Sequence, residues 1–168
     1  MLIAVVSDSH DAILHLRRAV ELANERGAAY LLHCGDLISP FMVLELARFK
    51  GQAIHLIQGN NPGDIWLLAK HCQKYPFIHL HGQYCFEELD GLKVALVHFP
   101  DLAYGLAATK RFDLVCCGHT HVYEVREVEG CPVINPGELL GKEGPPTMAF
   151  FDTESRQVEK VTFDEGGR

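Results

Sequence analysis

The sequence has little positive charge and no long apolar run. It contains 15 lysines and arginines against 22 aspartates and glutamates, which gives a formal net charge of −7. A protein that holds nucleic acid through its phosphates needs a clustered basic face, so this balance argues against an extended nucleic-acid surface. No stretch approaches the roughly 18 apolar residues of a membrane span. We therefore expect neither an extended nucleic-acid surface nor a membrane span, and bound divalent cations would still allow an anionic substrate.

The cysteines lack the spacing of a disulfide framework or a structural zinc site. Six cysteines are present, mostly inside apolar runs, and no CxxC pair occurs. We interpret them as reduced thiols of the core. The N-terminal apolar run also lacks a preceding basic segment and a small-residue cleavage site, so we expect a first strand and not a signal peptide. Both observations predict a cytoplasmic protein.

Signatures of several hydrolase classes are absent as well. Neither GxSxG, CGxCW nor HExxH occurs. These absences argue against a serine or cysteine nucleophile and against a zincin-type amide hydrolase. The length of 168 residues and the hydrophobic fraction of 48% are typical of one globular domain over residues 1–168. We expect residues 166–168 at its end to be frayed.

Strand-like and helix-like patterns alternate through the first two thirds of the chain. The strands are expected at 2–6, 29–34, 53–58, 77–89 (short strands around Gly82), 92–97 and 113–117, and the helices at 11–26, 41–49, 64–72 and 102–110. The first helix is expected to start with an aspartate cap. Only strands follow, at 122–128, 132–134, 147–152 and 158–163. This order predicts an α/β fold whose sheets carry helices on their outer faces.

Polar side chains gather where the apolar strands end. Five strand ends are followed by Ser7-Asp8-Ser9-His10, Gly35-Asp36, Gly59-Asn60, His98 and Gly118-His119-Thr120-His121. Each has an ordinary alternative on its own: a turn or cap for the aspartates, a loop for Asn60, a core histidine for His98, and a pair of solvated strand histidines for His119 and His121. Ligands of α/β sheets bind outside the carboxyl ends of the strands. The five ends together therefore predict one rim of metal-competent side chains, namely Asp8, His10, Asp36, Asn60, His98, His119 and His121.

The chemistry of this set favours two metal ions. Two carboxylates, one amide and four imidazoles exceed the three or four protein ligands of one catalytic transition metal. Nitrogen and oxygen donors without thiolate fit Mn²⁺, Fe, Zn²⁺, Co²⁺ or Ni²⁺, with manganese favoured. Two such ions about 3.5–4 Å apart form a clamp for in-line displacement at phosphorus.

In this order the motifs Asp8-x-His10, Gly35-Asp36, Gly59-Asn60, His98 and Gly118-His119-Thr120-His121 resemble those of the calcineurin-like metallophosphoesterase superfamily. Within it, the chain is most similar to the small single-domain phosphodiesterases of bacteria and archaea. The resemblance covers residues 1–152 and includes the turn Ile134-Asn135-Pro136-Gly137-Glu138. It implies a four-layer α-β-β-α sandwich with two mixed sheets, flanking helices, and a metal site at the carboxyl ends of the strands.

The resemblance also implies roles for individual residues. Asp8, His10, Asp36 and His121 would hold the first metal, and Asp36, Asn60, His98 and His119 the second. Asp36 would bridge the two ions, a metal-bridging hydroxide would attack phosphorus, and Asn60 would help to neutralise the phosphoryl oxygens. The implied function is a dinuclear metal-dependent phosphoesterase, a phosphodiesterase rather than a monoesterase. The alternative is a weakly active or inactive protein-binding scaffold, because the superfamily includes a retromer-type subunit of this fold.

The sequence departs from the family pattern in two places. Many relatives carry a histidine directly after the asparagine, where this chain has Asn61, so no side chain is evident to protonate a poor leaving group. Asp64 is a candidate replacement for the acidic partner of that histidine, and the alternative is a cap for the helix before Ile65. Relatives also read His-Gly-His where this chain has His98-Phe99-Pro100.

Other features of the site stay open. His33 is a candidate for orienting the loop that carries Asp36. The natural substrate, the metal identity and the oligomeric state do not follow from the sequence, which allows a homo-oligomer.

Overall fold

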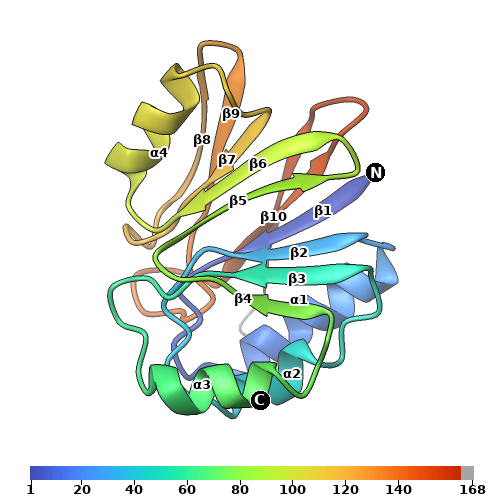
Figure 1. Ribbon diagram of the computed structural model, residues 1–168, viewed down its shortest axis with the longest axis vertical. Coiled ribbons are helices and arrows are strands. Elements are labelled where there is room, and N and C mark those ends of the chain that lie inside the picture. Colours follow the sequence, from blue (N-terminus) through green and yellow to red (C-terminus); the bar gives the residue numbers. More distant parts are fainter. Residues whose placement is uncertain (164–168) are drawn as a thin grey trace.

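Two β-sheets lie face to face, and helices cover the outer surface of each (Figure 1). The computed structural model describes residues 1–163, so the expected fraying of residues 166–168 lies outside the described part. Helices α1, α2 and α3 lie on one outer face and α4 on the other. The predicted α-β-β-α layering with two mixed sheets is therefore confirmed.

The first sheet has the order β11-β10-β1-β2-β3-β4. Strands β1 to β4 run parallel to one another. On the other side of β1, β10 is antiparallel to β1 and β11 is antiparallel to β10. β1, β2 and β3 are continuous apolar runs because helices and the second sheet cover both of their faces. The strands are β1 (Leu2–Val6), β2 (Tyr30–His33), β3 (Ala53–Leu56), β4 (Ile78–Leu80), β10 (Thr147–Asp152) and β11 (Val158–Thr162).

The second sheet has the order β5-β6-β7-β9-β8. Its inner strands β6, β7 and β9 are parallel, and the edge strands β5 and β8 are antiparallel to their neighbours. The strands are β5 (Tyr84–Leu89), β6 (Leu92–Val97), β7 (Leu114–Cys116), β8 (Tyr123–Val128) and β9 (Cys131–Pro136).

Each pair of layers encloses its own apolar cluster. The helices on the first sheet are α1 (Ile13–Glu25), α2 (Met42–Leu46) and α3 (Ile65–Cys72), and α4 (Pro100–Ala108) lies on the second. Leu16 and Val20 of α1 belong to the same apolar cluster as Ile54 of β3, while Ala103 and Ala107 of α4 pack near β7. A third cluster fills the space between the sheets. Burial of these apolar faces holds the two sheets in place, and the sheets in turn position the loops at the ends of their strands.

Most predicted elements agree with the structure to within a few residues, and the cap of the first helix is the exception. Its N-cap is Ala12, without a side-chain cap hydrogen bond. The amide of Ile13 donates its hydrogen bond to the main-chain carbonyl of Asp11, so it does not bind the Asp11 carboxylate as expected. All six cysteines are buried free thiols. Among residues 1–163, no helix is long and apolar enough to cross a membrane.

Candidate metal centre

The loops at the carboxyl ends of the strands adopt unusual backbone angles. Non-glycine residues in the left-handed region cost of order 1–3 kcal/mol each and persist only where the surroundings hold them. Five of the seven predicted site residues lie there, with φ of 50° at Asp8, 44° at His10, 59° at Asp36, 72° at His119 and 62° at His121. This concentration of strain marks the rim as a built site.

Main-chain hydrogen bonds tie these loops to one another. The amide of Asp8 donates to Gly35 O at 3.0 Å, and the amide of His10 donates to Asp36 O at 2.8 Å. The ends of β6 and β7 are joined in the same way, because the amide of Gly118 donates to His98 O at 3.0 Å. Each side chain is therefore presented from a braced loop.

Two buried carboxylates occupy the middle of the rim. Asp36 Oδ2 lies 3.6 Å from His98 Nε2 and 3.9 Å from His10 Nε2. Asp8 Oδ1 lies 3.5 Å from His121 Nε2 and 4.0 Å from His98 Nε2. The structure thus brings together two metal-competent groups, one of Asp8, His10 and His121 and one of Asp8, Asp36 and His98, with the donor atoms of each group within 4.8 Å of one another.

Several of these metal-competent atoms are buried without a hydrogen-bond partner. Within residues 1–163, the buried atoms Asp8 Oδ1, His10 Nε2 and His98 Nε2 have no hydrogen-bond partner. A buried polar atom left unsatisfied costs about 1–3 kcal/mol. Burial also raises the pKa of Asp8, whereas a cation would favour its charged form. Unpartnered nitrogen and oxygen donors that face one another fit divalent metal ions.

Partners on the far side of the rings orient two of the imidazoles. His98 Nδ1 lies 2.8 Å from Cys34 O, and His121 Nδ1 lies 2.6 Å from Glu138 Oε2. We assign the proton to Nδ1 in both rings because each faces an acceptor, which leaves the Nε2 lone pair directed at the carboxylates. This arrangement is typical of metal-binding histidines.

Glu138, which contacts His121, is a site residue that the sequence reasoning missed. It is 1% exposed, and its other oxygen accepts the amides of Glu143 at 2.6 Å and Gly144 at 3.2 Å. The only signal was its place in the turn 134–138. In the same turn, Asn135 donates to Gly118 O at 2.8 Å and to Thr120 Oγ1 at 3.0 Å. This turn therefore supports the loop that carries His119 and His121.

Asn60 and His119 lie together on the exposed rim, outside the two buried groups. His119 Nδ1 is 2.8 Å from Asn60 Oδ1, and the His119 ring centroid is 5.2 Å from that of His98. The main chain of His119 also contributes, because its amide donates to Asp8 Oδ2 at 3.0 Å. The seven predicted residues thus divide into five around the buried carboxylates and two at the solvent edge.

Asn61, Asp64 and His33 are neighbours of the site residues. Asp36 Oδ1 accepts the amide of Asn61 at 2.7 Å; burial opposes ionisation of Asp36, but His98 and this amide outweigh it and lower its pKa. The carboxylate of Asp64 accepts a hydrogen bond from the amide of Leu67 at 2.9 Å, so Asp64 caps α3, which is the alternative that the sequence left open.

His33 lies behind the loop that carries Asp36. Burial lowers the pKa of His33 to about 3, so its ring is neutral. One ring nitrogen is hydrogen-bonded to Ser9 Oγ at 2.9 Å, and the other accepts the amide of Gly35 at 3.3 Å.

Comparisons with known proteins agree with this geometry. A family model described as a calcineurin-like phosphoesterase superfamily domain matches residues 1–156. Phosphodiesterase MJ0936 of Methanocaldococcus jannaschii is 30% identical over 167 residues, which cover 98% of this chain and 100% of the relative. A solved structure described as a novel archaeal phosphodiesterase has a TM-score of 0.89 and 29% identity over 97% of this chain and 100% of its own. Vps29 of Chaetomium thermophilum, with a TM-score of 0.69, 17% identity, and coverage of 97% and 98%, shares the fold.

Proposed function

The chain belongs to the calcineurin-like phosphoesterase superfamily, and from this premise we propose that it is a dinuclear metal-dependent phosphodiesterase. The observation that carries the proposal is the set of buried, unpartnered donor atoms Asp8 Oδ1, His10 Nε2 and His98 Nε2. A protein that served only as a scaffold would gain nothing from leaving such atoms unsatisfied, since each costs stability. The proposed substrate is a small phosphodiester.

We assign the ligands in two sets that share Asp36. The first ion would be held by Asp8, His10, Asp36 and His121, and the second by Asp36, Asn60, His98 and His119. The position of Asp36 Oδ2, 3.9 Å from His10 Nε2 and 3.6 Å from His98 Nε2, supports its role as the shared ligand. Donors of nitrogen and oxygen without thiolate suit Mn²⁺, Ni²⁺, Fe, Zn²⁺ or Co²⁺, and we favour manganese.

The residues of the chain position the reaction. Bound divalent ions supply a water of lowered pKa and positive charge for the phosphoryl oxygens. Glu138 and Cys34 O hold the imidazoles of His121 and His98 in one orientation, so little reorganisation is needed on binding. Asn60 lies at the exposed rim, where its side chain would meet a phosphoryl oxygen of the substrate. Asp64 is engaged as the cap of α3, and we propose no catalytic role for it.

The compartment is a separate proposal. Six buried free thiols are typical of proteins from a reducing environment, which favours the cytoplasm.

The test is hydrolysis of a chromogenic aryl phosphodiester beside its monoester, with Mn²⁺, Ni²⁺, Zn²⁺ or a chelator. We expect metal-dependent turnover of the diester by the wild type and a loss of more than about 100-fold in Asp36→Asn. The matched control is Asp90→Asn, because Asp90 is also an aspartate in the left-handed region, with φ of 49°, but lies in the exposed turn between β5 and β6. Full activity in Asp36→Asn would count against the proposed centre, and no metal-dependent turnover at all would favour the scaffold.

A further inference from the structure

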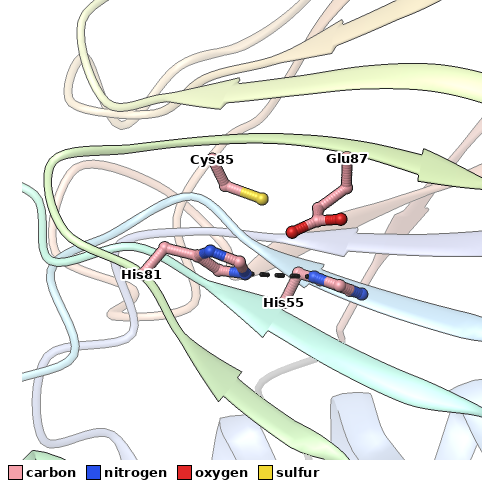
Figure 2. Close-up of side chains that lie close together, drawn as sticks. All are labelled: His55, His81, Cys85 and Glu87. Atoms are coloured by element: carbon pink, nitrogen blue, oxygen red, sulfur yellow. Dashed lines mark hydrogen bonds between the residues drawn. The ribbon is translucent and has the colours of Figure 1, made fainter.

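A second group of metal-competent side chains lies between the two sheets, away from the loops of the candidate metal centre (Figure 2). His55 comes from β3, His81 from the turn after β4, and Cys85 and Glu87 from β5. The four donor atoms lie within 4.8 Å of one another. We call these four residues the inter-sheet cluster, and none of them has a role in the proposed phosphodiesterase.

Strand alternation explains why these side chains meet. Ile54 and Leu56 of β3 pack on the helix side, so His55 between them faces the second sheet. On β5, Cys85 and Leu89 are buried in the core between the sheets, and Glu87 shares their face. Figure 2 shows the thiol and the carboxylate directed from β5 toward the two imidazoles. The cluster forms where the chain crosses from the edge of one sheet to the edge of the other.

The spacing is close to that of a tetrahedral ion. His55 Nδ1 and His81 Nε2 are hydrogen-bonded at 3.1 Å, and ligands of zinc with bonds of 2.0–2.3 Å are separated by about 3.3–3.8 Å, so a bound ion would replace this hydrogen bond with little movement of the rings. All four donor atoms lie within 4.8 Å of one another, so no pair has to close by more than about 1 Å to reach the spacing of zinc ligands. Glu87 is exposed, so its side chain has the rotamer freedom to do this.

We propose that His55, His81, Cys85 and Glu87 bind one transition-metal ion of the Zn²⁺ type, which joins the open edges of the two sheets. Four protein donors fill a tetrahedral ion and leave no position for a substrate, so the site is structural. One thiolate and one carboxylate would balance the charge of the divalent ion, which reduces the cost of holding it at a half-buried edge.

The two imidazoles are already in the protonation state that binds a metal ion, whereas the thiol has to lose its proton. Burial, with the neighbouring imidazoles of His81 and His79, lowers the pKa of His55 to about 4, and burial also lowers the pKa of His81. Both rings are therefore neutral ligands at neutral pH. Burial raises the pKa of the Cys85 thiol to about 12. Binding replaces its S–H bond by a bond to the metal and releases one proton to solvent.

Cobalt is the probe that separates this site from the catalytic one. Thiolate ligation of Co²⁺ produces a charge-transfer absorption in the near ultraviolet, and the proposed catalytic ligands include no cysteine. We expect the chelator-treated full chain to develop this band by the time Co²⁺ is saturating, because the cysteine-free ligands of the proposed catalytic centre also bind Co²⁺ but do not contribute to the band, and we expect Zn²⁺ to abolish it. Asp36→Asn should retain the band, so failure of the phosphodiesterase proposal and failure of this one are distinguishable.

Variants of the cluster decide the assignment. Cys85→Ser should abolish the band, and His81→Asn and Glu87→Gln should weaken Co²⁺ binding at least about tenfold. His79→Asn is the matched control, because the His79 ring stacks on His55 at 5.0 Å yet belongs to no donor set; it should bind as the wild type does. Cys131→Ser is the control for a buried thiol elsewhere.

Two results would overturn the proposal. One is the absence of the band in the wild type at saturating Co²⁺, and the other is a band that persists in Cys85→Ser. If circular dichroism shows that Cys85→Ser does not fold, Glu87→Gln and His81→Asn provide the test, because Glu87 is exposed and His81 is half-buried. Unchanged Co²⁺ affinity in both variants would refute the site.

Discussion

The carboxylate of Glu138 accepts a hydrogen bond from His121, with 2.6 Å between Oε2 and Nδ1. This bond fixes the tautomer of His121, so that Nε2 presents its lone pair to Asp8 Oδ1 at 3.5 Å. The amides of Glu143 and Gly144 hold the other carboxylate oxygen, which keeps Glu138 from turning away. Glu138 is therefore a positioning residue for one proposed ligand of the metal centre.

Glu138→Gln is expected to lower metal affinity about 10–100-fold, because the amide lacks the charge that raises the basicity of His121. Turnover measured against Mn²⁺ concentration should shift to higher metal and recover when Mn²⁺ is in excess. Glu127→Gln, on the exposed face of β8, should behave as the wild type. A loss of activity that excess metal does not restore would indicate a structural role only.

Gly118 marks a place where a side chain cannot enter. A β-carbon there would collide with Ser7 Oγ and lie 2.6 Å from Asp8 Oδ2. Gly118→Ala must therefore displace Asp8, and we expect loss of metal binding by calorimetry together with a loss of turnover of at least about tenfold.

Gly105→Ala is the control for this change. Nothing lies within 4 Å of a β-carbon at Gly105, which is in α4. Activity should be unchanged, and the free energy of unfolding should rise by about 0.5–1 kcal/mol, because alanine favours a helix more than glycine does. Equal activity of the two alanine variants would contradict the role given to Gly118.

Much of the fold was predictable because strands β1, β2 and β3 of the first sheet are buried on both faces. Continuous apolar runs such as Leu2–Val6 and Tyr30–His33 indicate strands directly, and the polar residues after them indicate the rim. The cap of α1 was predicted wrongly because a main-chain carbonyl competes with the Asp11 carboxylate for Ile13, and such competition depends on the loop conformation.

Residues that act through tertiary contacts could not be predicted in the same way. Glu138 meets His121 only because β8 and β9 pair in one register, which no local pattern encodes. The inter-sheet cluster depends on two sheet edges that face each other. The spacing from His55 to Cys85 matches no metal-binding motif, so the sequence alone gives no reason to combine them.

His119 and His121 test the partition of ligands between the two ions. His121 is held by Glu138 beside Asp8, whereas His119 lies at the rim beside Asn60. We expect His119→Ala and His121→Ala each to lose one Mn²⁺ per chain, and different ones, by elemental analysis after desalting. The double variant should then lose both. A double variant that keeps one ion would show that both histidines serve the same site.

Glu45 links the stability of the first layer to pH. It is buried on α2 and accepts from Arg17 Nε and Nη2, both at 2.9 Å. Arg17 lowers the pKa of Glu45 below its ordinary value. A carboxyl with a depressed folded pKa stabilises the protein above the pKa of the unfolded chain, and this contribution is lost as pH falls through the folded value.

Glu45→Gln should therefore lower the free energy of unfolding at pH 7 by about 1–2 kcal/mol, a value reduced because Arg17 is partly exposed. In urea unfolding below the folded pKa, wild type and variant should converge. Glu21→Gln, which removes only an exposed partner of Arg18 at 3.7 Å, should change stability little at either pH. An equal difference at both pH values would contradict the linkage.

The residue after Asn60 is expected to restrict the substrates. Asn61 is exposed, and its amide donates to Asp36 Oδ1 at 2.7 Å, so its backbone is fixed at the edge of the metal centre. Its side chain cannot supply a proton to a leaving alkoxide, and general acid catalysis is worth about 100-fold or more. Under saturating Mn²⁺ we expect the aryl diester to be turned over at least about 100-fold faster than an alkyl diester.

Asn61→His tests the cause of this preference. The position is exposed, so an imidazole enters without disturbing the core, and it should raise turnover of the alkyl diester about tenfold while leaving the aryl diester nearly unchanged. Asn61→Ala removes the amide without adding an acid and should change neither rate much. Since an aryloxide leaves without protonation, only the alkyl substrate reports the missing proton donor. Equal wild-type turnover of both diesters would mean that another group already protonates the leaving oxygen.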